Sequence, residues 1–269
     1  MTRRSFKVVG CFFLLAACTG RAPSHTGETG WTPDTDTDDT DTGDTDTGTP
    51  PASCDEGPSD IGTWFGGIDP TLVTSDAYTN DAGVAALVAA APADGEEATG
   101  TFAVSGATVT NVGYPPTKNF WFADANGAMR TYLYEDAATE VLPGMIVNFT
   151  ATTIKNYFGE SEVTAVSDFE VVSSGNPVQV VEALGANLDY ATQGRQMVHT
   201  YGQITAFIEE CGTTSSCWTF THGGADIRFR ISNEKGIIEG DCVEVVAPVA
   251  SYTPDTLFDV GNWDWMRWY

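Results

Sequence analysis

Basic residues are scarce in this chain of 269 residues, which has 12 Lys and Arg against 37 Asp and Glu and a formal net charge of −25. The part expected to fold shares the imbalance, because residues 59–269 carry 27 Asp and Glu against 8 Lys and Arg, a net charge of −19. Such a surface repels phosphate backbones and anionic lipids. We therefore expect nucleic acid to be bound weakly or not at all.

Motifs of the common hydrolases, metalloproteases and nucleotide-binding enzymes are also missing. His199 and His222 have no G-x-S-x-G, H-E-x-x-H or Walker glycine loop around them. Glu209 and Glu210 are adjacent, so on a strand they would point to opposite faces and could not form an acid–base pair. We expect a protein that is not an enzyme and that uses no cofactor or metal.

The N-terminus contains the apolar run "VVGCFFLLAA" after three basic residues, and no later apolar run approaches the ~20 residues of a membrane-spanning helix. A basic start, a short apolar stretch and small residues before a cleavage point are typical of a secretory signal. The stretch "LAAC", which ends at Cys18, resembles the lipobox of bacterial lipoproteins. The resemblance implies that 1–17 is a signal peptide, that Cys18 is acylated and that lipid holds the protein on the membrane. The alternatives are an ordinary signal peptide and a short membrane anchor in which the cysteine occurs by chance.

Residues 18–58 are predicted to form a disordered acidic tether. The stretch "TPDTDTDDTDTGDTDTGTP" has no apolar side chain and many like charges, so it cannot bury surface and should be extended. A calcium loop is the alternative, but Asp39 stands where such a loop needs glycine.

Thr19 follows the lipobox in place of the Asp that often retains lipoproteins at the inner membrane. The outer membrane or cell surface is therefore favoured.

Four cysteines remain for the folded part once the cysteine of the signal peptide and Cys18 are set aside. An even set in an oxidising compartment predicts two disulfides, with three possible connectivities. We favour Cys211–Cys217, which would clamp a hairpin tip, and with it Cys54–Cys242. A zinc site is the alternative, but the spacings lack paired C-x-x-C knuckles and nearby His.

Two glycine pairs of equal spacing indicate an internal duplication. Gly106 and Gly144 are 38 residues apart, as are Gly202 and Gly240, and the pairs are offset by 96 residues. After the second glycine of each pair, "GMIVNFTA" matches "GDCVEVVA", with apolar residues alternating as on the core face of a strand. The glycine before each run suits a turn that needs a positive φ.

Between these glycines, "FWFADANGAMRTYLY" and "CWTFTHGGADIRFRI" match at an offset of 97 residues. This match would place Trp121 and Trp218, and likewise Gly127 and Gly224, at equivalent positions. The pattern predicts an all-β fold of two five-stranded modules, 59–175 and 176–269. The expected strands are 101–111, 118–124, 127–135, 144–154 and 161–173, then 197–211, 217–222, 225–233, 241–251 and 256–268.

Short helices are expected before each barrel, over Ala82 to Pro92 and Pro177 to Asn187, because both segments carry helix formers and end at Pro or Gly. A bent first strand, "FWFADANGAMRTYLY", a turn glycine, "MIVNFTA" and "NYFGESEV" resemble the OB-fold module of secreted bacterial proteins, which is also appended to extracellular nucleases. The likeness covers about 98–175, and 194–269 less closely. It implies tandem OB-fold-like barrels.

Ligands of OB folds generally lie across the second and third strands and the adjoining loops. Aromatic rings and cations there would suit stacked bases or sugar rings. Alternatively, these side chains fill a barrel or interface, or pair with carboxylates. The aromatic end "NWDWMRWY", with Trp263 and Trp265 on one strand face, would close the second barrel or form an exposed platform. The candidate residues are Lys118, Trp121, Arg130, Tyr132, Tyr134, Tyr157, Phe158, Trp218, Arg228, Phe229 and Arg230.

The sequence thus predicts a non-enzymatic, surface-tethered lipoprotein with a binding or assembly role at the cell envelope. Capture of extracellular nucleic acid or oligosaccharide is one alternative, and a purely structural envelope component is another. The expected partners are the membrane, through the lipid anchor, and an envelope protein or glycan.

We predict that the mature protein begins at an acylated Cys18. The basic start, the short apolar stretch and the lipobox-like residues all point to cleavage before this cysteine. Mass spectrometry of the mature N-terminus checks the prediction. A free amine at Cys18, or a mature chain that starts at another residue, would contradict it.

Overall fold

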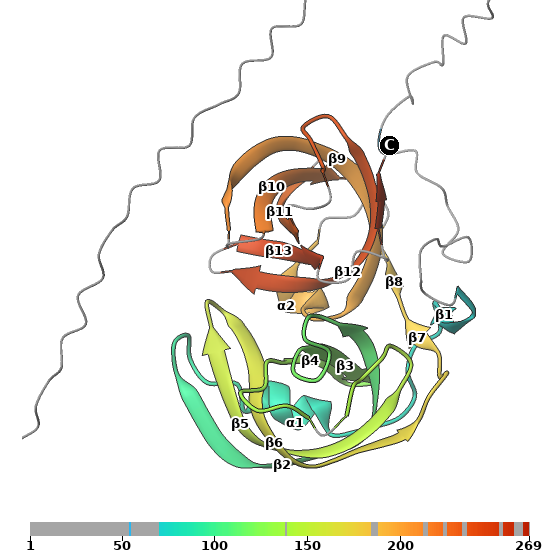
Figure 1. Ribbon diagram of the computed structural model, residues 1–269, viewed down its shortest axis with the longest axis vertical. Coiled ribbons are helices and arrows are strands. Elements are labelled where there is room, and N and C mark those ends of the chain that lie inside the picture. The colour runs from blue at the N-terminus through green and yellow to red at the C-terminus, as the bar shows by residue number, and fades with distance from the viewer. Residues whose placement is uncertain are drawn as a thin grey trace, which may run out of the picture. The chain divides into compact units, whose positions relative to one another are not determined.

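Two β-barrels make up most of the described chain (Figure 1). All described residues lie within one unit of the chain, Gly48–Tyr269. The expected signal peptide, Cys18 and tether, and also Trp263 and Trp265, lie outside them. The computed structural model describes residues 54, 70–137, 139–183, 188–211, 215–222, 225–232, 236–252, 255–260 and 266–268.

The first barrel closes in the strand order β2-β3-β4-β6-β5, in which β4 and β6 are parallel and the other pairs are antiparallel. This is the topology of an OB fold, in which the last strand returns between the third and the fourth. Its strands are β2 (Glu97–Val112), β3 (Phe120–Asp124), β4 (Gly127–Thr131), β5 (Ile146–Tyr157) and β6 (Glu160–Ser173).

The second barrel repeats this topology. Its strands pair in the order β9-β10-β11-β13-β12, β12 also pairs with β9, and β11 and β13 are parallel. The tandem five-stranded barrels expected from the duplication are therefore confirmed. The strands are β9 (Met197–Glu210), β10 (Ser215–His222), β11 (Ala225–Ser232), β12 (Cys242–Tyr252) and β13 (Asp255–Val260), with the short strands β8 (Val181–Glu182) and β14 (Met266–Trp268) added to the same sheet.

Each barrel has its own core, built from the alternating residues that the repeat predicted. Val147, Phe149 and Ala151 lie in the first core, and the corresponding Val243, Val245 and Ala247 lie in the second. The glycines before these strands have positive φ, 80° at Gly144 and 101° at Gly240, as the turn requires.

The segments before the barrels differ from each other. The first contains the expected helix, α1 (Val84–Ala89), preceded by the 3-10 turn η2 (Pro70–Leu72) and the strand β1 (Val73–Thr74). The helix expected over Pro177–Asn187 is wrong. The described part of this segment forms β7 (Val178–Gln179) and β8, and a one-turn helix, α2 (Tyr190–Gln193), follows it. Three valines in four positions favour extended backbone, and strand pairing with β1 and β9 outweighs the helix signals.

The β3–β4 and β10–β11 hairpins show that one expected equivalence between the two barrels is wrong. The last pair before the turn is Asp124–Gly127 in the first barrel and His222–Ala225 in the second, an offset of 98 residues. The sequence match had used an offset of 97 and had matched Gly127 to Gly224, which lies outside the described residues.

A shift of one residue on a strand moves a side chain to the other face. Trp218 therefore corresponds to Phe120, and its ring packs against the second core. Trp121 lies between the core residues Phe120 and Phe122, so it points to the outer face of the first barrel. Trp121 and Trp218 are not equivalent, and Trp121 corresponds to Thr219.

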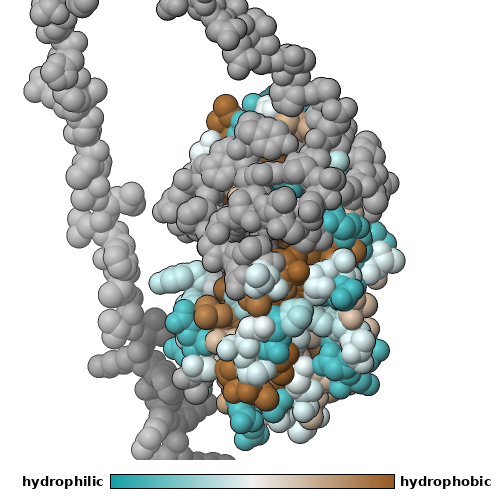
Figure 2. Space-filling view, turned by 90° about the vertical axis from the view of Figure 1, so that its right-hand side faces the viewer, coloured by the Kyte–Doolittle hydropathy of each residue, from teal (hydrophilic) through white to brown (hydrophobic). Residues whose placement is uncertain are grey.

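Both favoured disulfides are present, Cys211–Cys217 and Cys54–Cys242. Cys211 directly follows β9 and Cys217 lies on β10, so this bond clamps the β9–β10 hairpin as expected. Within the described residues, no helix has the length and apolar character needed to cross a membrane. Hydrophobic and hydrophilic residues are interspersed over the described surface in Figure 2.

A buried ion pair joins the two barrels. Glu160, at the start of β6, is 4% exposed and accepts a hydrogen bond of 2.8 Å from Nε of Arg195, which precedes β9. Its other carboxylate oxygen accepts one of 2.9 Å from the backbone N–H of Ser251 on β12. One carboxylate of the first barrel thus holds two separate segments of the second.

We predict that Glu160→Gln lowers the free energy of unfolding by roughly 3–5 kcal/mol, because it leaves the buried guanidinium of Arg195 without its counter-charge. Urea unfolding of wild type and variant measures the difference. The control is Asp136→Asn, which breaks an exposed pair with Lys118 and should cost at most about 1 kcal/mol. Equal losses in the two variants would contradict the prediction.

Candidate functional site

A cleft of about 360 Å³ opens where strands of both barrels meet. One wall comes from β4 and from the β5–β6 hairpin, and the other comes from β11 and from the β12–β13 hairpin. We call it the inter-barrel cleft. It is lined by Arg130, Tyr132, Tyr134, Lys155, Tyr157, Glu160, Glu162, Arg230, Ala250, Ser251, Tyr252, Leu257 and Asp259.

Arg130 lies on the first wall of the cleft. Its guanidinium carbon lies 4.9 Å from the ring centroid of Trp121 and 5.8 Å from that of Tyr132. Trp121 lies opposite Arg130 in the β3–β4 ladder, which explains why the cation covers this buried ring. These two cation–π contacts hold the guanidinium beside both rings.

Carboxylates from both barrels face the same guanidinium. Nε of Arg130 is 3.8 Å from Glu162 of the first barrel, and one terminal nitrogen is 3.5 Å from Asp259 of the second. Asp259 is also 3.9 Å from Arg230. The arginine charges of the cleft are therefore already balanced by neighbouring carboxylates.

Glu162 has a perturbed acidity. Burial raises the pKa of this carboxyl above its usual range, and the nearby carboxylate of Glu160 raises it further, whereas the charges of Arg130 and Lys155 lower it in part. A carboxyl with a raised pKa in a cleft is typical of functional sites, although structural ion pairs produce the same effect.

Four tyrosines line the cleft with much of their side chains open to solvent. Tyr132, Tyr134, Tyr157 and Tyr252 are between 42% and 56% exposed. Tyr132 and Tyr134 follow the end of β4, Tyr157 is the last residue of β5, and Tyr252 is the last residue of β12. Aromatic rings from both barrels are thus accessible to a bound molecule.

The cleft continues into a groove of about 420 Å³ that ends at the Cys211–Cys217 disulfide. Tyr157 and Tyr252 line both hollows. In this groove the ring of Phe158, at the tip of the β5–β6 hairpin, lies 4.9 Å from that of Tyr252. The two hairpins therefore form a continuous aromatic ridge between cleft and groove.

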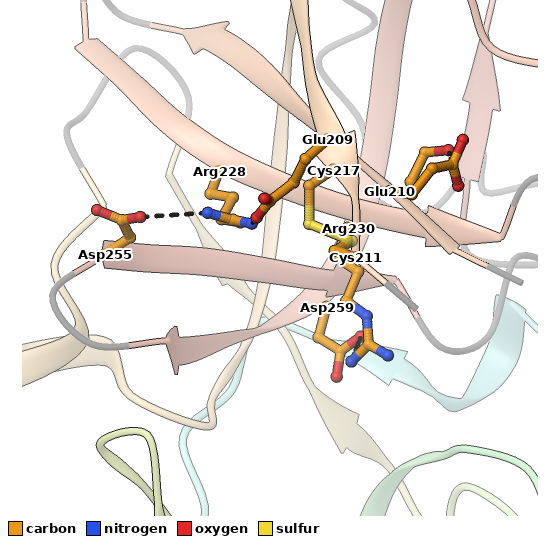
Figure 3. The surroundings of a disulfide bond; sticks show 9 residues. Glu209, Glu210, Cys211, Cys217, Arg228, Arg230, Asp255 and Asp259 are labelled. Atoms are coloured by element: carbon orange, nitrogen blue, oxygen red, sulfur yellow. Dashed lines mark hydrogen bonds and ion pairs between the residues drawn. A yellow bond between two sulfur atoms is a disulfide. The ribbon is translucent and has the colours of Figure 1, made fainter. Parts of the chain in front are cut away.

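Arg228 lies in the groove in a setting like that of Arg130. Figure 3 shows its guanidinium between the carboxylates of Asp255 and Glu209, close to the disulfide. Its guanidinium carbon is 5.2 Å from the ring centroid of Tyr252. With the hairpin offset of 98 residues, Arg228 corresponds to Arg130. The duplication has kept an arginine with an aromatic ring and two carboxylates at the same place in each barrel.

The candidate residues chosen from sequence fall into two groups. The structure brings Arg130, Tyr132, Tyr134 and Tyr157 together with Arg230 in the cleft, and Phe158 with Arg228 in the groove.

The remaining candidates lie apart from the open surface of the cleft. Trp121 is buried beneath Arg130, Phe229 is fully buried in the second core, and Trp218 packs against that core. Lys118 donates a hydrogen bond of 3.0 Å to the carbonyl oxygen of Tyr134 and lies 3.9 Å from Asp136.

Sequence reasoning missed the acidic half of the site. Glu160, Glu162 and Asp259 reach the cleft from strand ends, and Tyr252 reaches it from the last residue of β12. The equivalence between β5–β6 and β12–β13 could have suggested Tyr252, because its loop corresponds to that of Tyr157 and Phe158. Nothing in the sequence indicates that Asp259 faces the other barrel.

A smaller hollow of about 230 Å³ lies beside Asp124 and Asn126. The carboxylate of Asp124 accepts hydrogen bonds from the backbone N–H groups of Ala82 and Val84 and from that of Asn126. It therefore holds the start of α1 and the β3–β4 turn, and the inter-barrel cleft is the better candidate site.

His199, in the second barrel, is the other notable titratable group. It is fully buried, with Nδ1 2.8 Å from Glu182 and Nε2 2.8 Å from Glu244. Burial alone would lower the pKa of His199, but the hydrogen bonds and charges of Glu244 and Glu182 outweigh it and raise the pKa above 6.5. Within the described ranges, no three His, Cys, Asp or Glu side chains are grouped so as to hold a metal ion.

No protein-family model and no curated protein matches the chain. Solved structures that resemble it include the p204 HINb domain, with a TM-score of 0.32, 14% identity and coverage of 65% of this chain and 100% of that one. A murine DNA-binding protein bound to double-stranded DNA has a TM-score of 0.32, 12% identity and coverage of 62% and 94%. Fission yeast Pot1 with single-stranded DNA has a TM-score of 0.27, 9% identity and coverage of 65% and 84%. Likenesses at these scores carry no argument about a ligand.

We predict that the protein loses stability as the pH rises above about 6.5, because of His199. A histidine whose pKa is raised by folding contributes stability that is complete below its unfolded pKa of about 6.5 and is lost as the pH rises through the folded value. Urea unfolding between about pH 6 and pH 9 checks this. In His199→Gln the dependence should flatten, whereas a wild-type profile that rises with pH would contradict the prediction.

Proposed function

We propose that this protein is a non-enzymatic binding lipoprotein, anchored by lipid at Cys18 on the cell envelope, that holds its ligand in the inter-barrel cleft. The observation that carries the proposal is the place of the cleft. The outer face of β3 and β4, where OB folds commonly bind ligands, is the face on which Arg130 and Tyr132 lie. The lipid anchor rests on the sequence signals around Cys18.

Acidic side chains of the cleft already bind other groups of the protein, and this supports a binding role over a catalytic one. Glu160 is bonded to Arg195 and to the backbone of Ser251, and Asp259 lies between two arginines. An acid–base pair needs one carboxyl free to carry a proton and another free to accept one. In this cleft those groups hold the barrels together and balance the arginines.

Both barrels contribute exposed aromatic side chains to the cleft, and this supports a binding role over a purely structural one. Barrels that only packed together would be expected to bury their contact side chains. Instead, tyrosines from both barrels keep about half of their surface exposed around a hollow. Exposed aromatic groups gathered in a hollow mark binding sites more often than packing surfaces.

We predict that the mature chain, made soluble by Cys18→Ser, co-sediments with isolated cell envelopes and that the double change Tyr132→Ala and Tyr157→Ala weakens this binding by at least about tenfold. Aromatic contacts at the centre of a binding site are commonly worth ~1–2 kcal/mol each. The bound fraction is measured by sedimentation over a range of protein concentrations.

The matched control is Phe207→Ala. Phe207 is an aromatic residue with the same exposure as Tyr132, 49%, and it lies on β9 outside the lining of the cleft. This variant should bind envelopes as the wild type does. Retention that is unchanged in the double tyrosine variant, or no retention of the wild type, would overturn the proposed function.

A further inference from the structure

The charge pattern of the cleft separates the ligand classes that an OB fold could bind. A nucleic acid gains most of its non-specific affinity when several cations contact phosphates and release counterions. Here Arg130 faces Glu162 and Asp259, and Arg230 faces Asp259. A phosphate would have to compete with carboxylates that are already in place, which removes most of the gain.

Lys155 is the remaining cation of the cleft lining. Its ammonium group lies 5.9 Å from the ring centroid of Tyr157, and its residue lies opposite Glu162 in the β5–β6 ladder. One lysine beside a carboxylate cannot provide the run of cations that tracks a phosphate backbone. The same reasoning applies to a highly sulfated polysaccharide.

A ligand with hydroxyl groups does not have to displace the carboxylates from the arginines. Paired arginines keep N–H donors, and paired carboxylates keep oxygen lone pairs, because a planar guanidinium has five donors and a carboxylate has about four acceptor sites. A hydroxyl group both donates and accepts, so it can bond to either partner of an ion pair without separating them. The exposed parts of the tyrosine rings supply apolar contact beside these polar groups.

The arrangement of the rings also indicates the shape of the ligand. Tyr132 and Tyr134 lie on one wall, while Tyr157, Phe158 and Tyr252 continue toward the groove at the disulfide. A single small molecule would reach part of this surface. A chain of several ring units would reach rings on both barrels.

From this pattern we propose that the inter-barrel cleft and its groove bind a neutral, linear oligosaccharide whose sugar rings stack on tyrosines of both barrels. The inference rests on the proposed function, since it names the ligand class of the same site. The ion pairs of Arg130 and Arg228 act as fixed hydrogen-bonding groups for hydroxyls.

Isothermal titration calorimetry of the mature Cys18→Ser chain tests the proposal. The probes are maltohexaose, cellohexaose and chitohexaose as neutral chains, with heparin and an oligothymidylate as polyanions. At least one neutral chain should bind, and its affinity should change little between about 50 mM and about 300 mM salt because no counterions are released.

Variants place the binding in the cleft. Tyr132→Ala and Tyr157→Ala should each weaken binding of the neutral chain about tenfold, Tyr132→Phe should restore it, and Phe207→Ala should leave it unchanged. Because the tyrosines are half-exposed, these variants should unfold at the same temperature as the wild type. Binding that survives both alanine changes would overturn the proposal.

The outcomes also separate this proposal from the proposed function. Tyrosine-dependent binding to envelopes, together with no binding of any neutral chain, would overturn the ligand class and leave the binding role standing. Tighter binding of heparin or oligothymidylate than of the neutral chains would overturn the ligand class as well. Binding of the soluble chains without envelope binding would overturn the proposed role at the envelope and leave the ligand class standing, and binding of both would identify an envelope polymer.

Discussion

The carboxylate of Glu160 is the contact on which the geometry of the cleft depends. It receives Arg195 with one oxygen and the backbone of Ser251 with the other, so it fixes two points of the second barrel against the start of β6. Moving two charges out of water is costly, and such a pair is stabilising only when its remaining bonds are satisfied. Because both oxygens have partners here, the pair can specify how β12 faces β4. Arg130 and Asp259, which lie across the cleft, then come within 3.5 Å of each other.

The duplication gave the two barrels the same arginine and different surroundings. Arg130 and Arg228 occupy the same hairpin position, and each lies near an aromatic ring and two carboxylates. For Arg130 one of those carboxylates belongs to the other barrel, so its side chain lies in a cleft. For Arg228 both carboxylates, Glu209 and Asp255, belong to its own barrel and are about half exposed. One repeated motif therefore serves as the wall of a cleft in the first barrel and as part of a more open groove in the second.

Much of the fold could be predicted from the sequence because local patterns decide it. Alternating apolar residues after Gly144 and Gly240, and the positive φ that these glycines adopt, define the same strand in both barrels. The residue of the first barrel that corresponds to Trp218 could not be predicted. Two strand sequences can be aligned almost equally well one residue apart, whereas the hydrogen bonds of the ladder fix one register. The site was predicted only in its aromatic and cationic half. Its acidic residues come from distant strand ends, and their meeting is decided by how the barrels pack.

The overall charge of the protein and the charge of its cleft act over different distances, and both disfavour polyanionic ligands. A net charge of −19 over residues 59–269 acts at long range, but ions screen it beyond about 8 Å at physiological salt. A molecule in the cleft meets Arg130, Glu162 and Asp259 at much shorter distances, and these groups are already paired. The acidic surface weakens the approach of polyanions, and the paired cleft gives them little to bind on arrival. A neutral polar chain is affected by neither, so both scales of electrostatics favour the same class of ligand.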